Sequence, residues 1–575
     1  MAFGGADTEM FSALQLLLLL GTTEACTTII AGKKATADGS VMCTHSNDGE
    51  GNTDPRLVHI PARDHGAGAK RPIFFAPENY PRYTGVARGD VPAYRPVGNQ
   101  SAMKPIGFIP EVAHTFAYHE DTYGALNEHQ LGIGESTCSG KFGTKPLGQG
   151  GKAMMSVDTL SQLAMERTKS SRDAVKLMGA LAEKYGFYGA GSFEGTAESL
   201  LVTDPEEGFI FHILPDDTGT SAIWAAQRVP DDHIGVVANA FVIREVNFSD
   251  PFNFLGSASV HAVAQKKGWW SPSEGLLDFT LVYSDGEYAH KYYSGRRVWG
   301  VYHLLSPSLE LNATYEEYRR SKPYPVTAPP DKKVSVEDIA RAMRYYYEGT
   351  AYDQTVGLAG GPFGDPDHAL GGPGSHSTIK KGNWERTIGL WRTSDSYIVQ
   401  SRSWLPAAKG GVLWWGAHAA PYTVYVPLTG GMAALPRVTL GHQAVLDKGT
   451  LFWAIRYIAN LAKLKHSYMI KEISAFQTQM HAEGARLLAA ADAADGQEAD
   501  PGDALARHSA HVAEGLVELF DKLMFKYSDG FINVVQPDGS FSSSSVPYPD
   551  WWLKAVGYEE GPPPVPPTDS GVQFV

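Results

Sequence analysis

Cysteine is scarce in this chain. Three cysteines occur among 575 residues, at positions 26, 43 and 138. So small a number excludes a fold built on a disulfide framework, and an odd number leaves at least one thiol outside any intrachain disulfide. A single bridge between Cys43 and Cys138 stays open at this level.

Long hydrophobic runs are also lacking. The most apolar stretch, Phe11–Leu20, has the length of a signal-peptide core and is shorter than the roughly 20 residues of a membrane-spanning helix. Small side chains at Thr23 and Ala25 suit signal peptidase, so we predict cleavage between Ala25 and Cys26. The first ten residues contain no Lys or Arg, so an uncleaved anchor or a self-removed propeptide stays an alternative. Cleavage predicts a secreted protein, or one in a periplasmic or secretory or lysosomal-type compartment, with no stable membrane span after processing.

An excess of positive charge is missing as well. The formal net charge is −14, with 49 Lys and Arg against 63 Asp and Glu, so there is no basic surface of the kind that binds nucleic acid. The H-E-x-x-H pattern of common zinc peptidases does not occur. We therefore expect no nucleic-acid partner and no zinc site of the common peptidase type, and no sequence pattern calls for a cofactor.

The apolar pattern alternates between strand-rich and helical segments. Runs rich in β-branched and aromatic residues predict strands within residues 27–31, 40–44, 114–137, 199–242 and 387–428. Helical spacing marks residues 152–185, 330–347 and 446–525. Two sets of strands with helices outside them predict an α+β fold, in the form of a four-layer αββα sandwich.

The same pattern divides the chain into four parts. Residues 1–25 form the signal peptide or propeptide, and residues 26–430 the catalytic domain. Residues 431–560 are a mainly helical C-terminal region, and residues 561–575 are a Pro-rich tail.

Cys26 opens the stretch ACTTIIAGKKATADGSVMCTHSND, which reads as a β-hairpin ending at Asp48. After cleavage, Cys26 would carry a thiol and an α-amine on one residue. The amine has a pKa of about 7.7–8.0 and can take the thiol proton, so no catalytic histidine is needed. A carboxylate must then hold the amine, and Asp48 closes the second strand of the same hairpin.

Several ordered segments resemble one known family. They are the Cys26-to-Asp48 stretch, NEHQLGIGESTC (127–138), FYGAGSFEGTAESLLVTDPEEGFIFHI (187–213), WAAQRVPDDHIGVVANAF (224–241), YYSGRRVWGVYHLLSPS (292–308), RTIGLWRTSDSYIVQSR (386–402) and PYPDWWLKAVGYEEGPPP (547–564). Together they resemble the C69 dipeptidase family, the secreted dipeptidase A group of N-terminal-nucleophile (Ntn) hydrolases. The resemblance implies an Ntn αββα sandwich, cysteine-dependent hydrolysis of dipeptides, and no metal.

Four residues carry over from that resemblance as catalytic candidates. Cys26 matches the nucleophile, and Asp48 matches the acidic residue that holds its amine. Asn239, in VVANAF, matches an amide that donates to the oxyanion. Arg297, in SGRRVW, best matches an active-site arginine, with Arg296 as the competing register.

Three further residues are weaker candidates for substrate or oxyanion contacts. The family resemblance extends to more distant acylase relatives, penicillin V acylase and bile salt hydrolase. His45 stands where these acylase relatives carry an arginine, so it either binds a substrate carboxylate or simply ends a strand. Ser136 and Thr137 follow the strand LGIG, where those relatives place a second oxyanion donor.

The sequence therefore predicts a thiol dipeptidase, acting on a dipeptide or a small amide and able to form a homo-oligomer. Two alternatives stay open. One is an amidase or acylase for another N-acyl substrate, and the other is a secernin-like protein without enzymatic activity.

Overall fold

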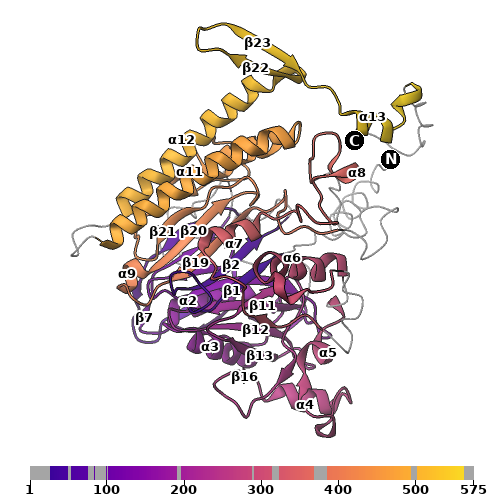
Figure 1. Ribbon diagram of the computed structural model, residues 1–575. Coiled ribbons are helices and arrows are strands. Elements are labelled where there is room, and N and C mark those ends of the chain that lie inside the picture. The colour runs from indigo at the N-terminus through magenta and orange to yellow at the C-terminus, as the bar shows by residue number, and fades with distance from the viewer. Residues whose placement is uncertain are drawn as a thin grey trace, which may run out of the picture.

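The structure is a computed structural model that describes residues 26–49, 54–75, 83–84, 99, 101–190, 196–287, 291–313, 323–367, 385–493 and 502–561. The predicted leader, and the Pro-rich tail after its first residue, lie outside these ranges. The described chain is a mixed α+β protein with two large antiparallel sheets and long C-terminal helices (Figure 1). The α+β prediction is confirmed at that level.

The first sheet holds the predicted hairpin at its centre. β1 and β2 pair antiparallel with Ile30 opposite Cys43, which confirms the hairpin. In order across the sheet, the seven strands are β18 (Thr327–Ala328), β14 (Ile234–Val237), β1 (Thr28–Ala31), β2 (Val41–Asn47), β19 (Asp395–Ser401), β20 (Gly411–Ala417) and β21 (Val426–Thr429).

The second sheet has eight antiparallel strands. In order, they are β16 (Phe254–Gly256), β13 (Ala222–Val229), β12 (Gly208–Pro215), β11 (Ala197–Thr203), β10 (Gly132–Cys138), β9 (Gly124–Asn127), β8 (Tyr118–Glu120) and β3 (Val58–Ile60). β12, with the sequence GFIFHILP, reads as a nearly continuous apolar run because both of its faces are buried.

The two sheets pack face to face, and β2 lies against β10 and β11. Gly134 in β10 is required at this contact, because an added Cβ would lie 2.0 Å from the carbonyl oxygen of Thr44 in β2. This close approach brings the next residue, Glu135, within hydrogen-bonding distance of His45.

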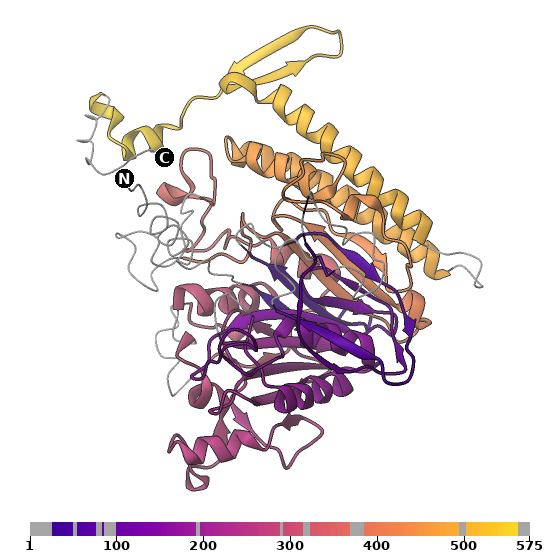
Figure 2. The same ribbon diagram turned by 180° about the vertical axis from the view of Figure 1, so that it is seen from behind.

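Helices cover the outer face of each sheet (Figures 1 and 2). α2 (Val157–Arg167) and α3 (Ser171–Tyr185) pack on the eight-stranded sheet, and each begins at a serine whose side chain accepts a backbone N–H. α10 (Leu451–Ala462), α11 (His466–Ala493) and α12 (Gly502–Lys526) lie over the seven-stranded sheet. These helices confirm the helical character predicted for residues 446–525.

The remaining elements connect or border these layers. The short strands are β4 (Arg63–Asp64), β5 (Lys70–Phe74), β6 (Pro105–Pro110), β7 (His114–Thr115), β15 (Glu245–Val246), β17 (Leu277–Asp278), β22 (Phe531–Val535) and β23 (Phe541–Ser545). The other α-helices are α4 (Ser259–Lys266), α5 (Phe279–Tyr283), α6 (Arg296–Leu305), α7 (Val336–Met343), α8 (Gly357–Gly360), α9 (Ala407–Gly410) and α13 (Asp550–Ala555). No helix in the described ranges combines the length and apolar character that crossing a bilayer requires.

Two local predictions were wrong. The segment TIGLWRT (387–393) is not a strand, because its end and the preceding Arg386 turn toward Asp48 instead of alternating across a sheet. The helix predicted to Tyr347 ends at Met343, and Tyr347 has a φ of 66°, in the left-handed region that a right-handed helix does not contain.

Candidate active site

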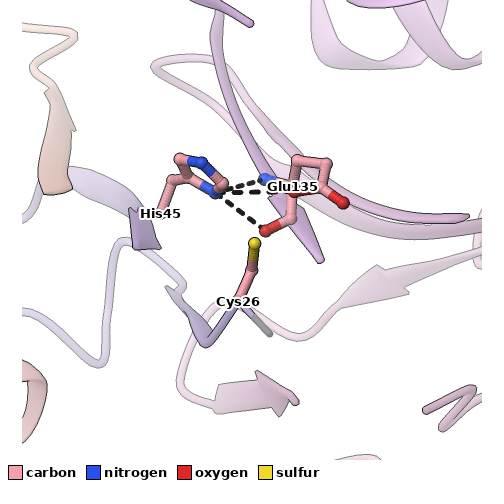
Figure 3. A group of neighbouring side chains, drawn as sticks. All are labelled: Cys26, His45 and Glu135. Atoms are coloured by element: carbon pink, nitrogen blue, oxygen red, sulfur yellow. Dashed lines mark hydrogen bonds and ion pairs between the residues drawn. The ribbon is translucent and has the colours of Figure 1, made fainter. Parts of the chain in front are cut away.

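Cys26 lies two residues before β1, and 1% of its surface is exposed. Its carbonyl oxygen accepts two hydrogen bonds, from Arg297 Nη1 at 2.7 Å and from Ser136 Oγ at 3.3 Å. These bonds come from α6 and from β10, so two separate parts of the fold hold the backbone of Cys26. Figure 3 shows the sulfur pointing toward Glu135 and His45.

The other two cysteines have different surroundings. None of the three, all of which lie within the described ranges, forms a disulfide, so the open Cys43–Cys138 bridge is not made. Burial raises the pKa of Cys43 to about 12 and raises the pKa of Cys138 well above its usual value. Their thiols contact Thr203 and Ser199 and lie within the paired strands. Neither has the thiolate character of a nucleophile.

Asp48 is completely buried just after β2. Arg386 donates to its Oδ2, and the hydroxyl of Thr393 donates to its Oδ1 at 2.5 Å. Ser46 Oγ lies 3.4 Å from Asp48 Oδ2 and accepts the backbone N–H of Thr27 at 3.0 Å. A short chain of polar contacts therefore runs from Asp48 to the residue that follows Cys26.

The sequence interpretation missed both partners of Asp48. Arg386 and Thr393 lie 338 and 345 residues along the chain from it. The available signal was the segment RTIGLWRTSD, which carries the family resemblance but reads locally as a strand.

Asn239 follows β14 with a φ of 51°, in the left-handed region that few residues other than glycine adopt. Its Nδ2 donates to the carbonyl of Thr137 at 2.7 Å, and its Oδ1 accepts from Arg297 Nη2 at 2.7 Å. Its backbone N–H donates to Ser136 Oγ at 2.9 Å. Since an amide nitrogen carries two hydrogens, Nδ2 has one more to donate.

Arg297 and Arg296 begin α6 and point in different directions. Arg297 is fully buried and donates to Cys26, Thr27 and Asn239. Arg296 instead pairs with Glu385, and its guanidinium lies 3.4 Å from the centre of the Tyr352 ring. The geometry therefore brings the favoured register, and not the competing one, to Cys26.

Burial, together with the nearby charge of Arg386, lowers the pKa of Arg297 to about 10. The guanidinium is still protonated at neutral pH.

His45 lies in β2, facing the second sheet. Its Nδ1 is 2.9 Å from the carbonyl oxygen of Glu135 and 3.8 Å from the carboxylate oxygen Oε2 of the same residue (Figure 3). Ligand atoms of Cys26, His45 and Glu135 all lie within 4.8 Å of one another, and no other such group occurs in the described part of the chain. Sequence reasoning named the segment that contains Glu135 but did not select this residue.

Ser136 and Thr137 connect these groups rather than standing apart from them. Ser136 Oγ bridges the Cys26 carbonyl and the Asn239 N–H. Thr137 Oγ1 donates to Glu135 Oε1 at 2.8 Å, and its carbonyl accepts from Asn239.

A cavity of about 270 Å³ adjoins the residues that hold Asp48. Thr393 lines it, together with three cationic side chains, Arg392, Arg456 and Lys463. Burial, together with the charges of Arg456 and Lys463, lowers the pKa of His418, another lining residue, to about 3. The cavity lining is therefore electropositive, although the pairing of Lys463 with Asp367 at 3.7 Å offsets part of this charge.

This site has the features expected of a cysteine hydrolase. They are a thiol outside any disulfide, an amide donor held in a strained backbone conformation, and buried charges around both. The sequence model of the family described as Peptidase family C69 matches residues 25–479. The chain belongs to this family and is a cysteine-type peptidase, which confirms the resemblance.

Three relatives illustrate the similarity. A protein named "Probable dipeptidase" from Salmonella dublin is 27% identical over 425 residues, covering 72% of this chain and 83% of the relative. A "Probable dipeptidase A" from Streptococcus pyogenes serotype M3 is 24% identical, and the match covers 88% of this chain and 98% of the relative. A "Dipeptidase" from Bifidobacterium longum is 24% identical, and the match covers 81% of this chain and 83% of the relative.

Proposed function

We propose that this chain is an exported dipeptidase of the N-terminal-nucleophile type, with the thiol of Cys26 as its nucleophile. Membership of family C69 and relatives named as dipeptidases support the activity. Two facing antiparallel sheets with helices on their outer faces support the αββα sandwich. One observation carries the assignment of the nucleophile: Arg297 and Ser136 both bond the carbonyl of Cys26 and both bond Asn239.

Once residues 1–25 are removed, the α-amine of Cys26 takes the thiol proton, because its pKa of about 7.7–8.0 leaves it partly neutral at pH 7. The thiolate attacks the peptide carbonyl. The second N–H of Asn239 Nδ2 and a backbone N–H stabilise the oxyanion. The amine returns the proton to the leaving amino group, and water then hydrolyses the thioester to release the first amino acid.

The surrounding residues position these groups. The bond from Arg297 to Asn239 Oδ1 orients the amide so that its nitrogen faces away from the guanidinium. Asp48 holds the α-amine, and the charge of Arg386 keeps this buried carboxylate compensated.

The electropositive cavity beside Thr393 supports a substrate with a free carboxylate. A dipeptide carries such a group next to its scissile bond, and Lys463 or Arg456 can pair with it. This feature favours dipeptides over neutral amides.

The test compares the full chain with a protein that begins at Cys26, and with its Cys26→Ala variant. Each is given a dipeptide, the corresponding dipeptide amide and an N-acyl amino acid, and mass spectrometry reads each N-terminus. We expect hydrolysis of the dipeptide by the protein that begins at Cys26, and none by Cys26→Ala. Preferential cleavage of the N-acyl amino acid would instead identify an acylase, and full activity with Met1 still present would overturn the N-terminal-nucleophile mechanism.

A further inference from the structure

The side chains of Cys26, His45 and Glu135 form a buried cluster whose ligand atoms lie within 4.8 Å of one another (Figure 3). We propose that this cluster is an inhibitory binding site for a thiophilic divalent cation, with Zn²⁺ as its main ligand. The bound ion occupies the nucleophile, so the site opposes catalysis instead of serving it.

The three donors are of the types that zinc prefers. Zinc bonds thiolate sulfur at ~2.3 Å and imidazole nitrogen or carboxylate oxygen at ~2.0–2.2 Å, so donors around a tetrahedral ion lie roughly 3–4 Å apart. The ligand atoms of the three residues all lie within 4.8 Å of one another, so only small side-chain movements are needed to bring them to the spacing of a tetrahedral zinc site. His45 Nδ1 and Glu135 Oε2 are already 3.8 Å apart.

The hydrogen bonding of the cluster points to a ligand. Glu135 is completely buried, and its Oε2 has no hydrogen-bond partner among the described residues. The same is true of Nε2 of His45. Buried polar atoms usually have a partner, so two such atoms on adjacent side chains require an explanation. A cation at Oε2 supplies it for Glu135, whose carboxylate lies next to the sulfur in Figure 3.

Charge favours the same conclusion. A thiolate and a carboxylate this close repel each other in a buried site, whereas a divalent ion balances both charges. The thiol proton is released to solvent when the ion binds. His45 binds as the neutral ring with its proton on Nε2, and Nδ1 gives up its hydrogen bond to the Glu135 carbonyl.

The fourth position depends on the N-terminus. If the proposed function is right, the α-amine of processed Cys26 completes the coordination and forms a five-membered chelate ring with the thiolate. In the uncleaved chain a water molecule takes this position, and the affinity is lower.

The experiment uses Co²⁺ as a spectroscopic substitute for Zn²⁺ in the chelator-treated protein that begins at Cys26. Thiolate-to-cobalt charge transfer reports binding at sulfur without any substrate, and Zn²⁺ should displace the cobalt. The variants are Cys26→Ala, His45→Gln and Glu135→Gln, with Cys138→Ala as the matched thiol control. Circular dichroism confirms that each variant is folded.

We expect a charge-transfer band in the wild type and in Cys138→Ala, and none in Cys26→Ala. Loss of a supporting residue around a metal typically costs about 10–100-fold in affinity, so removal of a direct ligand in His45→Gln or Glu135→Gln should cost at least ~10-fold. A missing wild-type band, a band that persists in Cys26→Ala, or unchanged affinity in both folded ligand variants overturns the site.

Hydrolysis by the chelated protein is measured separately, so the two proposals can fail independently. Dipeptide hydrolysis without cobalt binding would refute the metal site alone. Cobalt binding without hydrolysis would refute the dipeptidase assignment alone. Where both hold, Zn²⁺ should inhibit hydrolysis and a chelator should restore it.

Discussion

Replacing Arg297 by lysine should lower turnover sharply while the neighbouring substitution Arg296→Lys does not. Arg297 donates five hydrogen bonds within the buried site, two of them from Nη1 and two from Nη2. The acceptors are Tyr293 O, Cys26 O, Thr27 Oγ1, Ala238 O and Asn239 Oδ1. A lysine ammonium keeps a positive charge but has three N–H groups at a single point, so at least two acceptors lose their donor.

The magnitude follows from these contacts. Each buried acceptor left without a donor costs about 1–3 kcal/mol, so the loss of two donors should lower the free energy of unfolding by roughly 2–6 kcal/mol. The lower end applies if one of the two acceptors is the Cys26 carbonyl, which keeps its bond from Ser136. Removal of a whole oxyanion donor costs about 10²–10³ in kcat. Asn239 would keep its bond to Thr137, so we expect a loss of about 10–100-fold, or ~1.4–2.7 kcal/mol of transition-state stabilisation.

Steady-state kinetics on one dipeptide, with denaturant unfolding of the same samples, checks this expectation. Arg296→Lys is the matched control, because Arg296 is equally buried but contacts Glu385 and Tyr352. It should lose stability and keep its kcat. A wild-type kcat in Arg297→Lys, or an equal loss of kcat in both variants, would refute the reasoning.

Three further predictions concern the thiols, the leader and the cavity. Iodoacetamide should modify Cys26 and abolish hydrolysis, and a dipeptide should protect the enzyme. The other two thiols should not react, because burial raises the pKa of Cys43 to about 12 and that of Cys138 well above its usual value. Peptide mapping that finds only Cys43 or Cys138 labelled in the inactivated protein would contradict this. Ala25→Trp should block signal-peptidase cleavage and leave an inactive, longer chain, and full activity from that chain would argue against the mechanism. Lys463→Gln should raise KM for a dipeptide about 10-fold and leave KM for the dipeptide amide unchanged, since only the former has a carboxylate to pair; an equal rise for both substrates would exclude carboxylate binding.

Local pattern was enough to predict the central hairpin and the main helices. β1 and β2 are short β-type runs around a turn-rich segment. This local pattern places Cys26 before the first strand of the hairpin and Asp48 after the second, independently of the rest of the chain. The serine N-caps of α3 and α7, Ser170 and Ser335, are also of the kind that local sequence encodes, because capping depends on residues within one helical turn. The order of the family segments also carried the peptidase assignment.

Local pattern failed where the decisive contacts join distant parts of the chain. Arg296 and Arg297 are adjacent and chemically identical, and only the rotation of α6 against the sheets brings Arg297 to Cys26, 271 residues away. Thr393 was predicted to lie in a strand and Arg386 directly before it, yet both hold Asp48 across more than 300 residues.

Sequence reasoning placed Glu135 directly after the strand LGIG and did not select it for the site; its position beside Cys26 depends on how the two sheets pack. Gly134 permits the close approach of β10 to β2, and this sets the carboxylate beside the thiol. The sequence alone therefore determined the nucleophile candidate, its hairpin and its family, because short-range spacing encodes them. The tertiary structure alone decided which charges surround the nucleophile, because burial and side-chain direction depend on how the two sheets and α6 pack together.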